Sequence, residues 1–148
     1  MTAARLRAAG VALAGQAGAG VSVYLTLVHS AAAPLACSAS GVVNCERVLT
    51  SGFAVLAGTS VPTSAAGIAW FGVSALLALA RLRSDAPPLA RLQLAWSAAG
   101  LAVVLVLVFV EIVLVGAICA WCTGAHLLVL LTFLVVVQEA FAPPTSDG

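Results

Sequence analysis

The chain has 148 residues, of which 63% are hydrophobic and 7% are charged, and its mean hydropathy is +1.18. A soluble domain carries about 25% charged residues, so this composition cannot cover a globular surface with polar groups. The net charge is +1 and lysine is absent, which leaves no basic patch for nucleic acid. We therefore expect an all-α membrane protein of one domain that binds no nucleic acid.

Four apolar segments are long enough to cross a bilayer, which takes about 20 residues for about 30 Å of hydrocarbon. They cover residues 8–28, 62–80, 89–110 and 116–137. The first segment could be read as a signal peptide with a small-residue cleavage site near Ala31, but its apolar run is longer than such peptides carry. We predict a retained span and a four-transmembrane-helix bundle within residues 1–148, with no fused thioredoxin-like domain.

The connection between the first two spans, residues 29–61, is too polar in its first half to cross the membrane. Its second half, residues 45–57, is moderately apolar and short, which predicts a short interfacial helix. Asn44 is a favoured N-cap for that helix. Ser60, with Pro62 in the first turn, predicts the start of the second span.

The arginines predict the orientation. Five of the six precede the first span or flank the turn between the second and third spans: Arg5, Arg7, Arg81, Arg83 and Arg91. The positive-inside tendency places that side in the cytoplasm, with both termini. The cysteines then fall toward the extracytoplasmic side, where disulfides persist. We predict a multi-pass protein of the cell membrane whose active site faces outward and whose short helix lies in the first extracytoplasmic loop.

The four cysteines form two pairs. Cys119 and Cys122 make a C-x-x-C at the start of the fourth span, where residues at i and i+3 share one face and can form a disulfide. The free N–H groups of the helix start lower the pKa of the nearer thiol, Cys119, while Cys122 lies deeper. Cys37 and Cys45 have seven residues between them, a flexible segment in which this pair can meet, part or approach the C-x-x-C.

Two dithiol pairs, one near water and one near lipid, favour a relay between a soluble thiol and an acceptor in the bilayer. Structural disulfides and a zinc site built from the four thiolates are alternatives. The wide, flexible spacing of Cys37 and Cys45 argues against zinc, so we predict no metal site. A scaffold with two stapling disulfides is a further alternative.

Three segments together resemble the vitamin K epoxide reductase family in its bacterial form. They are Cys37…Cys45-Glu-Arg-Val-Leu-Thr-Ser51, then Pro62-Thr-Ser64-Ala-Ala-Gly67, then Cys119-Ala-Trp-Cys122-Thr, and the likeness covers nearly the whole chain. The resemblance implies a four-helix transmembrane bundle around a quinone, either menaquinone or ubiquinone. It further implies that Cys122 engages the quinone, that Cys119 resolves it, and that Cys37 and Cys45 are a shuttle pair in which Cys45 passes electrons inward.

The activity that the resemblance implies is that of a thiol:quinone oxidoreductase. It would oxidise a separate exported thioredoxin-like protein, reduce a membrane quinone and so support disulfide formation. Reduction of vitamin K quinone or its epoxide is an alternative, and a membrane carrier of metal or thiol compounds is one from another class. Thr63 and His126 stand where animal members carry asparagine and tyrosine, so epoxide reduction is the weaker alternative.

Five residues are predicted near the quinone. Ser51 aligns with a serine or threonine that lies near the site in the family, and Thr63 occupies the asparagine position. His126 follows Cys122 by one helical turn on the same face and could give a hydrogen bond or proton to a quinone oxygen. The alternative for His126 is a histidine satisfied by a neighbouring helix. Phe53 and Leu56 are predicted to form an apolar lid over the quinone.

Glu111 closes the third span near its outer end. It could supply protons, but an interfacial carboxylate solvated by water is the prediction we favour. No site role is therefore assigned to Glu111 from the sequence.

Overall fold

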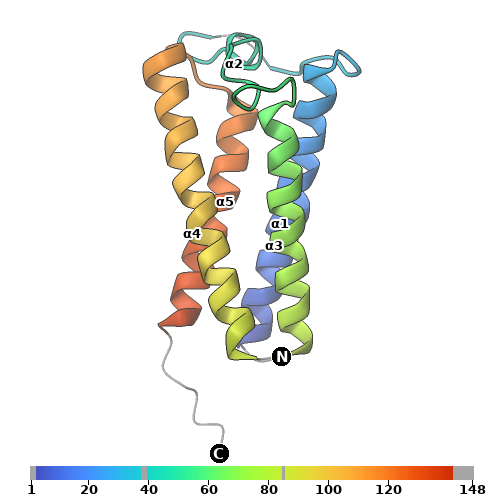
Figure 1. Ribbon diagram of the computed structural model, residues 1–148, viewed down its shortest axis with the longest axis vertical. Helices are drawn as coiled ribbons and strands as arrows, with labels where there is room; N and C mark the ends of the chain where they lie inside the picture. Colours follow the sequence, from blue (N-terminus) through green and yellow to red (C-terminus); the bar gives the residue numbers. More distant parts are fainter. Residues whose placement is uncertain (1–2, 38–39, 85, 142–148) are drawn as a thin grey trace, which may run out of the picture.

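The computed structural model describes residues 3–37, 40–84 and 86–141. Long helices run side by side along the molecule: α1 (Ala3–His29), α3 (Thr63–Arg83), α4 (Pro87–Phe109), which continues as the π-helix η1 (Val110–Val115), and α5 (Ala120–Ala140) (Figure 1). A short helix, α2 (Cys45–Leu49), lies with the loops at one end of the bundle. The described residues form four helices long and apolar enough to cross a membrane, counting α4 with η1 as one. The predicted all-α fold with four spans is confirmed.

The fourth span begins at Ala120 rather than at residue 116. Gly116 ends η1 with a φ of 67°, a left-handed conformation that glycine adopts without a steric penalty. The chain then runs extended through Ile118, which forms a parallel bridge with Val43. The four residues that looked like the first turn of a helix therefore connect the outer loop to the bundle.

The interfacial helix is shorter than predicted. Residues 45–57 were expected to be helical, but α2 ends at Leu49. The hydroxyls of Thr50 and Ser51 donate to carbonyls of the preceding turn at 2.8 and 2.7 Å, a local alternative to continued helix. The start is as predicted, because the Asn44 side chain caps it by accepting a backbone N–H at 2.9 Å.

The helix α3 begins at Thr63, directly after Pro62, so the predicted start at Ser60 is wrong. Pro62 is the extended residue that precedes the helix, and no side-chain hydrogen bond caps it. The Thr63 N–H donates instead to the carbonyl of Ala54 at 2.8 Å, across the loop. The loop after α2 is thereby fastened to the start of α3.

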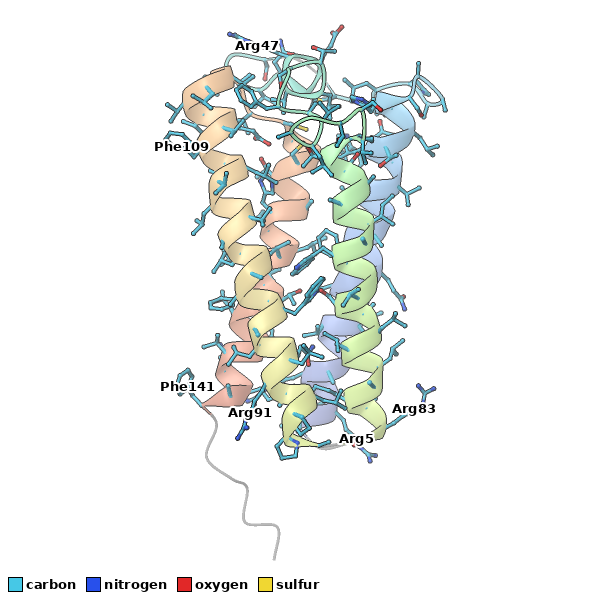
Figure 2. The ribbon with its side chains drawn as sticks, viewed as in Figure 1. Arg5, Arg47, Arg83, Arg91, Phe109 and Phe141 are labelled. Atoms are coloured by element: carbon cyan, nitrogen blue, oxygen red, sulfur yellow. A yellow bond between two sulfur atoms is a disulfide. The ribbon has the colours of Figure 1, made fainter. Side chains whose placement is uncertain are left out.

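The two ends of the bundle differ in charge. Figure 2 shows Arg5, Arg83 and Arg91 at one end and Arg47 at the other, where α2 and the loops lie. The end with three labelled arginines is the one that the sequence predicts to be cytoplasmic.

A buried ion pair ties three helices near the arginine-rich end. The Arg81 guanidinium donates to both carboxylate oxygens of Glu139 at 2.6 and 2.8 Å, and to Gln93 Oε1 at 3.1 Å. The Arg81 and Glu139 side chains are only 11% and 12% exposed. Because these residues come from α3, α5 and α4, the cluster fixes how those helices meet.

Replacing Arg81 by leucine should strongly destabilise the bundle, because the Glu139 carboxylate would lose its partner while remaining buried. Breaking one side of such a pair costs about 3–5 kcal/mol of unfolding free energy. Arg83→Leu is the matched control, since Arg83 is an exposed arginine on the same helix, and it should change the free energy by about 0.5 kcal/mol or less. Equal losses in denaturant unfolding in detergent would contradict this assignment.

Candidate active site

The outer pair (Cys37 and Cys45) forms a disulfide. Cys45 is the first residue of α2 and is 1% exposed, whereas Cys37 is half-buried. The expectation that this whole pair lies near water is therefore wrong for Cys45. An apolar cluster explains the burial; its members are Cys45, Val48, Val115, Ala117 and Cys119, with Leu35, Cys37, Val110 and Cys122 packed against them. All four cysteines belong to this one cluster.

Backbone pairing holds the two pairs together. The Asn44 N–H donates to the carbonyl of Ile118 at 3.0 Å, and the Ile118 N–H donates to the carbonyl of Val42 at 2.9 Å. Asn44 and Ile118 directly precede Cys45 and Cys119 in the chain. The register of this short bridge therefore places Cys45 and Cys119 at neighbouring positions.

The inner pair (Cys119 and Cys122) is present as free thiols at the start of α5. Cys119 is the N-cap, is fully buried, and its Sγ accepts the Cys122 N–H at 3.2 Å. The pKa of the Cys119 thiol is lowered, chiefly by a hydrogen bond from the Cys122 thiol and further by the N–H groups of Cys122 and Trp121, against the opposing effects of burial and the Glu111 charge. The N–H groups of the helix start thus lower the pKa of Cys119 in the predicted direction, but the Cys122 thiol is the larger cause. Cys122 is the more accessible of the two.

Trp121, between the inner cysteines, holds the loop that leads to Cys37. Its Nε1 donates to the carbonyl of Ala36 at 2.8 Å, and its ring packs on Tyr24 with centroids 4.9 Å apart. The Tyr24 hydroxyl donates to Pro34 at 3.1 Å and accepts from the Ala36 N–H at 2.7 Å. These contacts connect α1, α5 and the chain immediately before Cys37.

A cavity of about 510 Å³ lies between the four spans, beneath the loop that follows α2. Its size is in the range of small-molecule sites, and its walls are mostly apolar. All five residues predicted to contact a quinone line it, together with Cys122: Ser51, Phe53, Leu56, Thr63 and His126. Both inner cysteines therefore pack in the apolar cluster, but only Cys122 also lines the cavity.

The polar groups of the cavity differ in what they can offer a carbonyl oxygen. The Ser51 hydroxyl donates to the carbonyl of Val48 at 2.7 Å, and the Thr63 hydroxyl donates to that of Phe53 at 3.3 Å. In this arrangement both hydroxyl hydrogens are engaged. A neutral histidine carries one ring N–H, so His126 is the better candidate to donate to a quinone carbonyl.

Two tryptophans form the floor of the cavity. Trp70 Nε1 donates to the carbonyl of Trp96 at 3.4 Å, while Trp96 Nε1 donates to the carbonyl of Trp70 at 3.2 Å and to Ser74 Oγ at 3.1 Å. Gly100 packs against the Trp70 indole so closely that a Cβ at this position would overlap the ring. These contacts join α3 to α4 below the site.

The cavity reaches the outer surface of the bundle between α3 and α4. Ala66 and Ala69 of α3, and Ala99 and Val103 of α4, line the cavity and are also exposed. They belong to two of the four candidate membrane spans among the described residues. The opening therefore faces lipid, which suits an apolar molecule that arrives from the bilayer.

Glu111 is where the sequence interpretation was wrong. It is 6% exposed, lines the cavity, and accepts the Cys119 N–H on Oε2 at 3.3 Å. Cys122 lines the same cavity as the Glu111 carboxylate. The signal available in the sequence was a single carboxylate inside an otherwise unbroken apolar run, which marks a functional candidate.

Comparison with known proteins decides the family. A model of the vitamin K epoxide reductase family matches residues 10–137, which is nearly the whole chain. The chain belongs to the vitamin K epoxide reductase family. A search of curated proteins gave no match.

The matched region of this vitamin K epoxide reductase family member contains both cysteine pairs and the described residues that line the cavity. Family membership supports a membrane oxidoreductase with a quinone-linked redox and disulfide function. The residues present fit a quinone, because the cavity is apolar, opens to lipid and is lined by the free thiol of Cys122. The four candidate spans make the chain a multi-pass membrane protein.

Proposed function

We propose that the protein is a membrane thiol:quinone oxidoreductase that oxidises an exported thioredoxin-like protein and reduces menaquinone or ubiquinone. The observation that carries this proposal is the joining of all four cysteines in one apolar cluster, from which Cys122 also reaches the quinone-sized cavity. Such a chain of sulfurs can pass electrons by thiol–disulfide exchange without any exposed intermediate.

The outer pair is open to a thiol partner from the loop end. A second hollow, of about 740 Å³, is lined by both outer cysteines together with polar residues such as Asn44 and Glu46. Since Cys45 is buried, we assign attack by the partner's thiolate to Cys37, which releases Cys45 as the new thiolate. Cys45 then attacks Cys119 of an oxidised inner pair, and Cys37 closes the outer disulfide again. An outer disulfide beside an inner dithiol is the arrangement that this transfer would leave.

The inner pair then delivers the electrons. Cys122 presents its sulfur to the cavity, and Cys119, whose thiolate is favoured at the start of α5, forms the disulfide with it. A bound quinone accepts two electrons and two protons and leaves as quinol. The protein supplies orientation, an apolar site that excludes water, and the donor N–H of His126.

The charge distribution supports an extracytoplasmic active site. The arginine-rich end would face the cytoplasm of a cell membrane, and this topology would put both termini on the same side. The cysteines lie at the opposite end, because Cys45 begins α2 and the other three cysteines belong to the same apolar cluster. The partner would then be met in the oxidising compartment, where disulfides are made.

The proposal is tested with purified protein in detergent, a reduced thioredoxin-like donor and menaquinone or ubiquinone. We expect the quinone absorbance to bleach only when donor and protein are both present, while a titration without reductant finds the outer cysteines oxidised. Four reactive or metal-protected thiols and no quinol would instead favour a metal carrier.

Blocking the lateral opening should hinder quinone binding. Ala99→Trp places an indole at the cavity wall between α3 and α4, and we expect the KM for quinone to rise about tenfold, equivalent to about 1.4 kcal/mol of lost binding. Ala98→Trp is the matched control, because Ala98 is a neighbouring exposed alanine that does not line the cavity. The same rise in KM for both variants would place the quinone's route elsewhere.

A further inference from the structure

Glu111 is the one carboxylate among the described residues that lines the cavity. Its position follows from η1: the wider turn of a π-helix buries both Glu111 and Val115 on the inner side. The Glu111 carbonyl accepts the N–H groups of Gly116 and Ala117, the latter at 3.1 Å, and this turn brings the chain back to Cys119. The carboxylate is therefore held between the inner pair and the cavity.

The reaction proposed above needs a proton carrier at this position. Oxidation of the inner dithiol releases two protons in an apolar, water-excluding region, and reduction of a quinone consumes two. Cys119 contacts the Glu111 carboxylate through its N–H, and Cys122 lines the same cavity as Glu111. A carboxylate that lies between the inner pair and the cavity can transfer each proton over a short path.

We propose that Glu111 carries protons from the inner pair to the quinone, an inference that rests on the proposed function. The Glu111 carboxylate takes the proton that Cys122 loses, and the resulting carboxylic acid gives it to a quinone oxygen. Glu111 then accepts the proton of Cys119 and gives it to the second oxygen. Two S–H bonds break, one S–S bond forms, and the two electrons and two protons convert quinone to quinol, so no further reductant is required.

Glu111→Gln tests the proton role while keeping the shape of the site. The amide oxygen can still accept the Cys119 N–H, so the start of α5 and the thermal stability should be retained. We expect the single-turnover rate of quinone reduction to fall about 100-fold, the lower range for loss of a positioned acid–base group. Arg47→Gln removes an exposed charge on α2 at the same end of the bundle, at a residue that lines neither the cavity nor the outer hollow, and it should leave the rate unchanged. Glu111→Asp keeps the acid group and should recover part of the rate.

A second readout needs no quinone. In wild-type protein, the infrared difference spectrum between oxidised and reduced inner pair should contain a carboxyl band, which Glu111→Gln should lack. A wild-type protein that reduces no quinone would contradict the proposed function. The carboxyl band would still show whether Glu111 changes its protonation when the inner pair is oxidised. If wild type is active, an unchanged turnover rate or an unchanged band in Glu111→Gln overturns the proton role. If Glu111→Gln does not fold, Glu111→Asp takes its place. A lower rate of quinone reduction and a displaced carboxyl band in Glu111→Asp would then support the proton role, and an unchanged rate or band would overturn it.

Discussion

Replacing Cys122 by alanine should abolish quinone reduction. Cys122 is the cysteine that faces the cavity, while Cys119 is fully buried and cannot substitute for it. Removing a covalent nucleophile from an enzyme can cost about 10⁴-fold or more in rate. We expect the quinone absorbance to bleach no faster than with thiol donor alone. Cys122→Ser should behave in the same way, because a hydroxyl cannot form the disulfide.

The outer disulfide provides the internal control for this experiment. In Cys122→Ala the pair Cys37–Cys45 is untouched, so its reduction by a thioredoxin-like donor should proceed as in wild type. The variant would then accept electrons from the donor and fail to pass them on. A Cys122→Ala protein that still reduces quinone would show that another sulfur reacts at the cavity.

Replacing Cys45 by alanine should break electron delivery without harming the quinone site. Thiol-dependent turnover with a thioredoxin-like donor should fall to background, because Cys45 is the buried outer cysteine that lies beside Cys119 in the apolar cluster. A small reductant that reaches the inner pair directly should restore quinone reduction. In cells, Cys37 should accumulate in a mixed disulfide with an exported protein, visible on a non-reducing gel.

Cys37→Ala distinguishes the two outer cysteines. It also loses donor-dependent turnover, but the remaining Cys45 is 1% exposed and should trap little or no partner. Equal trapping in both variants would contradict the assignment of Cys37 as the residue that meets the partner.

Much of the fold could be predicted because the bilayer imposes a length and a composition on each span. The four apolar segments correspond to α1, α3, α4 with η1, and α5. The predictions were wrong at helix boundaries, which single residues determine. The hydroxyls of Thr50 and Ser51 end α2, and Gly116 ends η1 so that α5 begins later than predicted. Hydropathy averaged over a segment does not register such single-residue effects.

The candidate site was predicted where its residues carry a motif. The C-x-x-C, Ser51 and His126 were each chosen from pattern or resemblance, and Cys122, Ser51 and His126 line the same cavity. The burial of Cys45 and Glu111 was not predicted, because it depends on contacts between segments distant in sequence. The bridge at Ile118 seats Cys45 against the inner pair, and the π-turn directs Glu111 inward.

The number of quinols formed per chain tests the electron path most directly. Fully reduced protein, freed of reductant and mixed anaerobically with excess quinone, contains two dithiols, each a two-electron donor. We predict about two quinols per chain for wild type and about one for the double variant Cys37→Ala/Cys45→Ala, which retains only the inner pair. One quinol from wild type would mean that the outer pair does not feed the inner one, and none would contradict quinone reduction altogether.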